Sequence, residues 1–411
     1  MKRNFLFLAM VFLLSSIPIQ ANETITLFEA ISNAMVHNTS LKEERIAVNM
    51  VRSMVNQARL VPNPQVNVSV QHPDFETSLS VEQPIDIGGK QAISIRIAEL
   101  THEIAALNYR AKRLALISNV SQVFFDTFAT QEQHRLIQSF LEIEENYYQR
   151  VLEKVLAGKA SMQDQKRAGV QVTLRRLALQ KITDQLGIQK RELSRLWGEN
   201  SPKFELLPSN FWNLASPKSL ETYQSMLSKN PTWEAQERSI VLAQSTAELA
   251  KSNLWSPVTL GAGIAYKQGS NQTSGILSIG FPLPIADQNQ WKIEQSSLEI
   301  NRATVAKTAI QLTLMQALEQ RYSELQIAYR EAQSLNLDII PTLESIRKNA
   351  QEGYLQGKWP YTDVIDAQKS SLESKHLYLD IVSRYHQSLA QIDELTTQFS
   401  DKFKGDLNEN N

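Results

Sequence analysis

The sequence predicts an α+β membrane protein in which a β-hairpin and a very long helix occur twice along one chain. Three observations lead to this fold class. A segment that begins at residue 156 returns 199 positions later, which indicates a duplicated module. Very long helical segments follow a coiled-coil spacing, and four short segments alternate apolar with small or polar residues.

Composition excludes several classes of protein. The 411 residues carry a net charge of −1 and contain no cysteine. Disulfides, thiolate metal sites and a lipid-modified N-terminal cysteine are therefore excluded. The chain has no basic excess and no basic run with interleaved aromatic residues, so nucleic acid is not an expected partner.

The N-terminus has the pattern of a secretory signal peptide over residues 1–21. Lys2 and Arg3 precede the apolar run "FLFLAMVFLL", and Ala21 provides a small residue at the cleavage site. The apolar run is too short to span a bilayer, which disfavours a membrane anchor. A secreted chain without cysteines fits a bacterial envelope. The other end, residues 399–411, is expected to be a polar, disordered tail.

The internal repeat divides the chain. "LAGKASMQDQKRA" at 156–168 matches "LQGKWPYTDVIDA" at 355–367 in Leu, Gly, Lys, Asp and Ala. Each half is expected to contain a helix, a hairpin, a long helix and another helix. We expect a first repeat over 22–198 (hairpin 66–85, long helix 91–157, helix 161–197), a linker over 199–217, and a second repeat over 218–398 (hairpin 258–283, long helix 288–356, helix 361–398).

The long helices set the length of the molecule. Residues 91–157 contain neither Gly nor Pro, and as one helix they would reach about 100 Å. Apolar residues follow coiled-coil spacing at Leu100, Ile104, Leu107, Ala111 and Leu114, and again from Leu325 to Ile339. Pro341 should kink the second long helix. Helices of this length exceed a small globular core and must pack side by side as a rod or tube.

The four strands match transmembrane β-strands in length and alternation. In "VNVSVQ" the valines alternate with polar residues, and "VTLGAGIAYK" follows the same pattern. A soluble sandwich would show the same alternation, but no other β segment is predicted that could cover a face. Four strands cannot close a barrel, and open sheet edges do not persist in lipid. Two copies would supply eight strands and three would supply twelve, and the room for a pore favours three.

The whole arrangement resembles the TolC-like outer-membrane efflux proteins over about residues 24–398. The matching segments are "TLFEAISNAMVHNTSL", "PNP" before the first strand, "QPIDIGGKQ" after the second, and "YLQGKWPYTDVIDAQ". "QPIDIGGK" is most similar to the subgroup that serves heavy-metal pumps of the cobalt–zinc–cadmium type. This resemblance implies a homotrimer in which a 12-stranded barrel crosses the lipid of the outer membrane and a helical tunnel crosses the periplasm.

The resemblance also implies partners and a gate. The partners would be a periplasmic adaptor (membrane fusion) protein and an inner-membrane, proton-driven pump of the RND type. Asp363 and Asp366 match the aspartates that line the closed aperture in the family. Asp164 and Tyr354 match positions that tie neighbouring coils shut, and Lys358 is the nearest candidate for their basic partner. The alternative for Asp363 and Asp164 is local, since Asp is favoured in the first turn of any helix.

No enzymatic or cofactor site is predicted. A glycosidase-like carboxylate pair would need a cleft lined by aromatic residues, which the surroundings of Asp363 and Asp366 do not supply. "IDIGGK" lacks the spacing of a phosphate loop, and the six histidines have no metal-ligand spacing. The resemblance implies that the protein is an exit duct, most similar to those of metal exporters. Multidrug efflux, type I protein secretion and a periplasmic coiled-coil scaffold remain as alternatives.

Overall fold

The computed structural model describes residues 23–72, 76–200, 202, 204–207, 210–254 and 257–399. The expected signal peptide and the tail from residue 400 lie outside these ranges. The described first half contains β1 (Glu23–Ile25), α1 (Leu27–His37), α2 (Thr39–Ala58), β2 (Gln65–Gln71), β3 (Glu76–Ile85), α3 (Lys90–Leu156), α4 (Met162–Arg195) and β4 (Phe204–Leu206). The second half contains α5 (Leu220–Gln224), α6 (Pro231–Ser252), β5 (Val258–Lys267), β6 (Gln272–Gly280), α7 (Gln290–Ser334), α8 (Ile340–Leu355) and α9 (Tyr361–Thr396).

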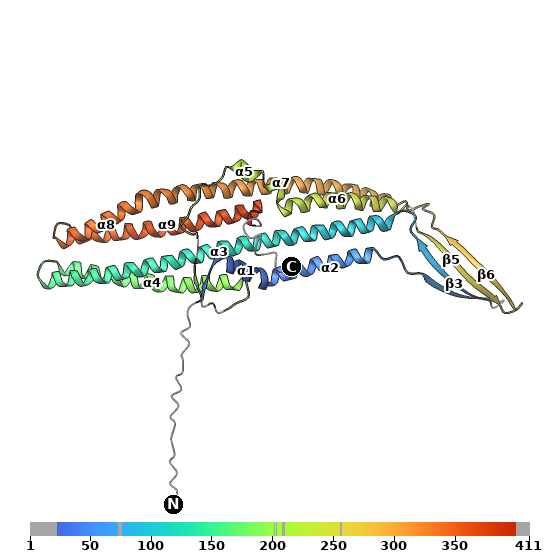
Figure 1. Ribbon diagram of the computed structural model, residues 1–411, viewed down its shortest axis with the longest axis horizontal. Helices are drawn as coiled ribbons and strands as arrows, with labels where there is room; N and C mark the ends of the chain where they lie inside the picture. Colours follow the sequence, from blue (N-terminus) through green and yellow to red (C-terminus); the bar gives the residue numbers. More distant parts are fainter. Residues whose placement is uncertain are drawn as a thin grey trace, which may run out of the picture.

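The molecule is an elongated rod (Figure 1). A β-sheet occupies one end, and the turns between α3 and α4 and between α8 and α9 lie together at the other. Between these ends the helices run side by side along the long axis. We call the far end the tip, the α3–α4 pair the first helical hairpin, and the α8–α9 pair the second helical hairpin.

The sheet at the opposite end is antiparallel, with strand order β2-β3-β5-β6. The two β-hairpins join through β3 and β5, which pair along their full length from Glu76–Lys267 to Ile85–Val258. The outer strands β2 and β6 each pair with one neighbour only among the described residues. Each therefore presents a row of backbone donors and acceptors that no other described strand of the chain uses.

The pairing register sorts the side chains of the sheet by polarity. Val68 lies opposite Leu79, and Leu79 lies opposite Ile264, so large apolar residues share one face. All three are exposed, at 68%, 46% and 58%. The other face carries small or polar residues such as Ser80 and Gly263, which lie opposite each other. The alternation predicted for the strands is thus continuous from strand to strand.

The first long helix, α3, corresponds closely to the segment expected over 91–157. In the second half, the segment expected over 288–356 consists of α7, a π-helical turn over Leu335–Ile339, and α8. Pro341 lies at the start of α8, directly after that turn. Since proline has no N–H to donate, the irregular hydrogen bonding falls where the sequence places Pro341.

The sequence predicted a single helix before each β-hairpin. This prediction was wrong, because both helices are broken. Asn38 ends α1 and begins α2, and in the second half Asn230 begins α6 after a short 3₁₀ turn. Each asparagine caps the following helix through its side-chain oxygen. Its Nδ2 donates to a distant carbonyl, Asn38 to Leu196 at 2.9 Å and Asn230 to Leu395 at 3.0 Å. The breaks are therefore held by the end of the last helix in the same half.

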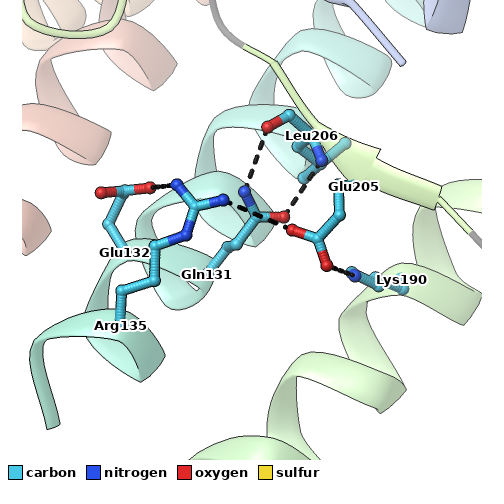
Figure 2. Close-up of polar contacts among 6 residues, drawn as sticks. All are labelled: Gln131, Glu132, Arg135, Lys190, Glu205 and Leu206. Carbon is cyan, nitrogen blue, oxygen red and sulfur yellow. Dashed lines mark hydrogen bonds and ion pairs between the residues drawn. The ribbon is translucent and has the colours of Figure 1, made fainter. Parts of the chain in front are cut away.

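The middle of the rod, which we call the waist, contains β structure that the sequence did not predict. β1 and β4 form a short parallel pair, with Ile25 opposite Leu206. The side chain of Gln131 on α3 holds β4 by donating to the Leu206 carbonyl and accepting from its N–H, both at 3.0 Å (Figure 2). Glu205 adds ion pairs to Arg135 of α3 and Lys190 of α4. The main apolar core surrounds this junction.

Candidate functional site at the helix tips

Both tip turns have the same backbone design. The chain leaves α3 through Gly158 and leaves α8 through Gly357, with φ of 70° and 76°. The following N–H reaches back five residues in each case, Lys159 to Lys154 and Lys358 to Gly353, both at 2.8 Å. These are Schellman turns, in which glycine accepts the left-handed conformation without a Cβ clash.

Asp164 takes part in a local capping box at the start of α4. Its N–H donates to Ser161 Oγ at 3.1 Å, and its carboxylate accepts from the Ser161 N–H at 3.3 Å. This arrangement is the helix-start role that Asp can fulfil in any fold. Asp164 also lies close enough to Tyr354 to act on it: burial, and then the negative charge of Asp164, raise the pKa of the Tyr354 phenol.

Asp363 and Asp366 lie in the first two turns of α9, and both side chains are exposed. Pro360 is the N-cap residue of α9 and offers no capping side chain, and among the described residues Asp363 accepts only a long hydrogen bond of 3.5 Å from Thr362. Asp366 has no hydrogen bond or ion pair to the part of the chain that the structure describes. Their charges are thus available at the tip surface.

Tyr354 is almost entirely buried, at 5% exposure, in a cluster of aromatic rings between the two helical hairpins. Its ring centroid lies 5.8 Å from that of Tyr147 on α3 and 5.4 Å from that of Tyr361 on α9. Tyr147 and Tyr361 stack at 5.9 Å. The tyrosines therefore join the first helical hairpin to the second.

Among the described residues, the cation that contacts Tyr354 is Lys154, a residue that the sequence did not single out. Lys154 Nζ donates to the Tyr354 carbonyl at 2.6 Å and lies 4.5 Å from the centroid of its ring. Lys358, in contrast, has an exposed side chain, and its N–H closes the tip turn. Phe140, Tyr147 and Lys154 are seven residues apart on α3, and this heptad spacing could have indicated that they share a face.

A charged layer lies farther from the tip than the tyrosines, on the same four helices. Arg175 of α4 donates through Nε and Nη2 to one oxygen of Glu144, at 3.2 and 2.8 Å. In the second helical hairpin Glu344 accepts from Lys375 at 2.8 Å. The two cations lie on the same ring, Phe140, with Arg175 at 5.9 Å and Lys375 at 5.6 Å from its centroid. This layer, like the tyrosine cluster, spans both hairpins.

The pKa values of the two carboxylates in the layer, Glu144 and Glu344, are shifted in opposite directions. Burial raises the pKa of Glu144, and the hydrogen bond and charge of Arg175 oppose this only in part. Burial also raises the pKa of Glu344. Hydrogen bonds from Arg347, Lys375 and Ser371 outweigh this effect and lower the pKa of Glu344 to about 2. Glu344 is therefore ionised, within a network of two cations and one hydroxyl.

Two further observations concern the part of the chain that the structure describes. Across the described ranges, no group of three or more His, Asp or Glu side chains is arranged to hold a metal ion. Nor does any described helix have the length and apolarity needed to cross a membrane.

A rod of paired long helices that carries a four-stranded sheet with an exposed apolar face defines the class of the protein: it has the protomer fold of an outer-membrane efflux channel. The family model described as "Outer membrane efflux protein" matches residues 30–199 and 222–398. The chain belongs to this family and is an efflux channel of the outer membrane.

Curated relatives and solved structures agree with this assignment. The chain is 27% identical over 381 residues to the cobalt-zinc-cadmium resistance protein CzcC of Cupriavidus metallidurans, covering 92% of this chain and 91% of the relative. It is 22% identical to the cation efflux system protein CusC of Escherichia coli K12, covering 85% and 82%. A crystal structure of CusC superposes with a TM-score of 0.71 at 19% identity, covering 90% of this chain and 91% of that one.

Proposed function

We propose that three copies of this chain form the exit duct of a tripartite efflux system for heavy-metal cations. The sheet is the observation that supports this assembly. Its apolar face is exposed, and both of its edge strands, β2 and β6, have an unpaired edge within the described chain. Pairing β2 of one copy with β6 of the next would satisfy both edges and close a 12-stranded barrel. The helices would then form the periplasmic tunnel, and the tip would face a periplasmic adaptor and an RND-type pump in the inner membrane.

The proposed cargo rests on the relatives whose names state a substrate. CzcC is named a cobalt-zinc-cadmium resistance protein and CusC a cation efflux system protein, and this chain covers most of the length of both. The "QPIDIGGK" segment, which indicated the same subgroup, forms the end of β3 and the turn into α3, where Asp86 accepts from the N–H groups of Gly88 and Gln91. These hydrogen bonds shape the backbone of the turn and do not identify a cargo. The cargo must therefore be tested directly.

Growth of a deletion strain tests the cargo. We expect sensitivity to one or more of zinc, cobalt, cadmium, copper and silver, restored by the intact gene, and unchanged tolerance of dyes and detergents. Sensitivity confined to dyes and detergents would instead assign the duct to multidrug export.

We further infer that Asp363 and Asp366 form the gate, with Asp164, Tyr354 and Lys358 beside them. In a trimer, six carboxylates would surround the axis at the tip, which would attract cations and hold a hydrated constriction. The exposure of both aspartates supports this inference. Asp164 supports it less, because the capping box accounts for its position.

The domain organisation is inferred to be a duplication with repeats over 22–198 and 218–398 joined by residues 199–217. Equivalent contacts support it. Asn38 and Asn230 each reach the end of the last helix in their own half, and the same Schellman turn closes both helical hairpins. The repeated sequence around Gly158 and Gly357 places these turns in register.

A further inference from the structure

Exposed apolar side chains continue beyond the end of the sheet, where β6 leads toward α7. Leu277 and Ile279 of β6 belong to the apolar face of the sheet. After the strand ends, apolar residues keep to every second position, as Phe281, Leu283 and Ile285. All three are exposed, Ile285 at 82%. We call residues 281–285 the exit segment; it extends the apolar surface past the last strand residue.

The segment that leads into the first strand of the sheet has the same character. Leu60 and Val61 are exposed, at 63% and 65%, and two prolines, Pro62 and Pro64, follow before β2 begins. We call residues 60–64 the entry segment. The entry segment connects α2 to β2, and the exit segment connects β6 to α7. Both therefore lie at the boundary between the sheet and the helical rod.

The proposed barrel would bring the two segments of neighbouring copies together. In an antiparallel pair, the end of one strand lies beside the start of the other. If β6 of one copy pairs with β2 of the next, the exit segment of the first copy therefore lies beside the entry segment of the second. Three such pairs would surround the base of the barrel. We call this ring of six segments the collar.

Prolines determine the level in the membrane at which the collar can lie. Pro282 and Pro284 of the exit segment and Pro62 and Pro64 of the entry segment have no N–H to donate. The two segments therefore cannot continue the hydrogen-bonded ladder between β6 and β2. Backbone groups outside a ladder do not persist in hydrocarbon, because no water is present there to pair with them. Apolar side chains on such a backbone fit the boundary between lipid headgroups and acyl chains.

The start of α7 fits the same environment. Trp291 is 75% exposed, and the exposed Lys292 follows it. Tryptophan is enriched at membrane–water interfaces, and lysine is attracted to anionic headgroups. The acidic residue of this connection, Asp287, accepts from the N–H of Asn289 at 2.9 Å within the turn. Its carboxylate is thus engaged by the chain itself.

We propose that the collar binds the headgroup–acyl boundary of a glycerophospholipid leaflet at the base of the barrel and fixes the depth of the duct in the membrane. The acyl chains contact the apolar side chains, and headgroups and water pair with the backbone. The collar rests on the proposed function, because the barrel assembly places the segments of neighbouring copies side by side.

A chain without cysteine allows each position to be labelled on its own. Ile285→Cys and Leu60→Cys, each carrying an environment-sensitive dye, report on the collar. Leu79→Cys is the reference for the apolar face of the sheet, Ser80→Cys for the opposite face, and Leu156→Cys, which is exposed at the tip, for water. Each purified variant is reconstituted into vesicles of phosphatidylethanolamine and phosphatidylglycerol. The vesicles contain lipid with a spin-label quencher either at the headgroup or deep in the acyl chain.

The dyes at Ile285 and Leu60 should be quenched more strongly by the headgroup label than by the deep label. The dye at Leu79 should show the reverse order, and those at Ser80 and Leu156 should be quenched by neither. The ratio of headgroup to deep quenching should be about twofold or more higher at Ile285 than at Leu79, since about 15 Å separates the edge of the hydrocarbon from its centre.

The collar and the barrel can fail separately in this experiment. Quenching at Leu79 without quenching at Ile285 and Leu60 overturns the collar and leaves the barrel in place. A blue-shifted dye at Ile285 that neither label quenches places the exit segment against the neighbouring copy, which also overturns lipid binding. Stronger quenching of the collar dyes by the deep label overturns the assigned level. An unquenched dye at Leu79 overturns the proposed barrel, and the collar with it.

Discussion

The side-chain amide of Gln131 pairs with the backbone of Leu206 as a neighbouring β-strand would, one bond in each direction at 3.0 Å (Figure 2). Gln131 is 2% exposed, and β4 has only three residues. The amide thus extends a very short parallel pair and fixes the segment between the two halves against α3.

Gln131→Ala should destabilise the waist, because it leaves the N–H and C=O of Leu206 without these partners. The expected cost is about 1–3 kcal/mol for each buried group that water cannot reach. Thermal unfolding in detergent, followed by circular dichroism, measures it. Gln138→Ala is the matched control, since Gln138 is exposed on the same helix and should change stability by less than about 0.5 kcal/mol. Equal melting temperatures for the two variants would contradict the role assigned to Gln131.

Replacing Asp363 and Asp366 together by Ala should raise leak through the channel and weaken block by divalent cations. The reason is that the ring of carboxylates, which attracts cations and holds the hydrated constriction together, would be lost. Conductance in planar lipid bilayers, with and without added divalent cation, provides the measurement. Glu373→Ala removes an exposed carboxylate farther along α9 and should leave both quantities unchanged. Unaltered leak and unaltered block in the double variant would show that the aspartates serve only the helix start.

Glu344 should make the stability of the helical hairpins depend on acid pH. Its folded-state pKa is depressed from 4.5 to about 2, so its contribution is present above pH 4.5 and is lost as the pH falls toward 2. In Glu344→Gln this contribution is absent at every pH. The difference in melting temperature between wild type and Glu344→Gln should therefore shrink between pH 5 and pH 2.5. A constant difference over that interval would rule out the network around Glu344 as its source. Glu144, whose pKa is shifted upward, is present in both proteins and cancels in the comparison.

Adjacent residues of β3 should respond differently to a positive charge. Leu79 lies on the apolar face and Ser80 on the opposite face, at nearly the same depth along the strand. If the apolar face contacts lipid, Leu79→Lys should reduce assembly, with a cost of about 2–4 kcal/mol near the middle of the bilayer, and Ser80→Lys should be tolerated. The amount of heat-dissociable oligomer in outer-membrane fractions distinguishes them. Loss of oligomer in Ser80→Lys alone would reverse the assigned faces.

The features that sequence predicts well here are those that one segment determines by itself. The length of α3 follows from a long run without Gly or Pro, and the strands follow from alternation. The features that it missed depend on partners far along the chain. Asn38 breaks a helix because its side chain donates to the Leu196 carbonyl, and the three-residue strand β4 is held by β1 and by the side chain of Gln131.

In the candidate site, too, sequence predicted the features set by one segment and missed those set by distant partners. The tip turn was predictable from Gly357, and the aspartates from their place in the repeat. Lys154 was not, since its contact is with a residue 200 positions away. Its heptad relation to Tyr147 indicated a shared face, but which side chain would meet it depended on how two hairpins pack together.

The pairing of Ile25 with Leu206 at the waist has a consequence for how such a chain can be built. The first half starts and finishes at the same level of the rod, and the second half returns to that level, where Phe399 joins the same core as Ile25. A gene fusion that linked two such units in tandem would need only a short connector along the side of the rod. Neither the sheet nor the tip would have to be re-routed. For the same reason, a reporter domain fused near Phe399 should emerge midway along the rod and leave both working ends unobstructed.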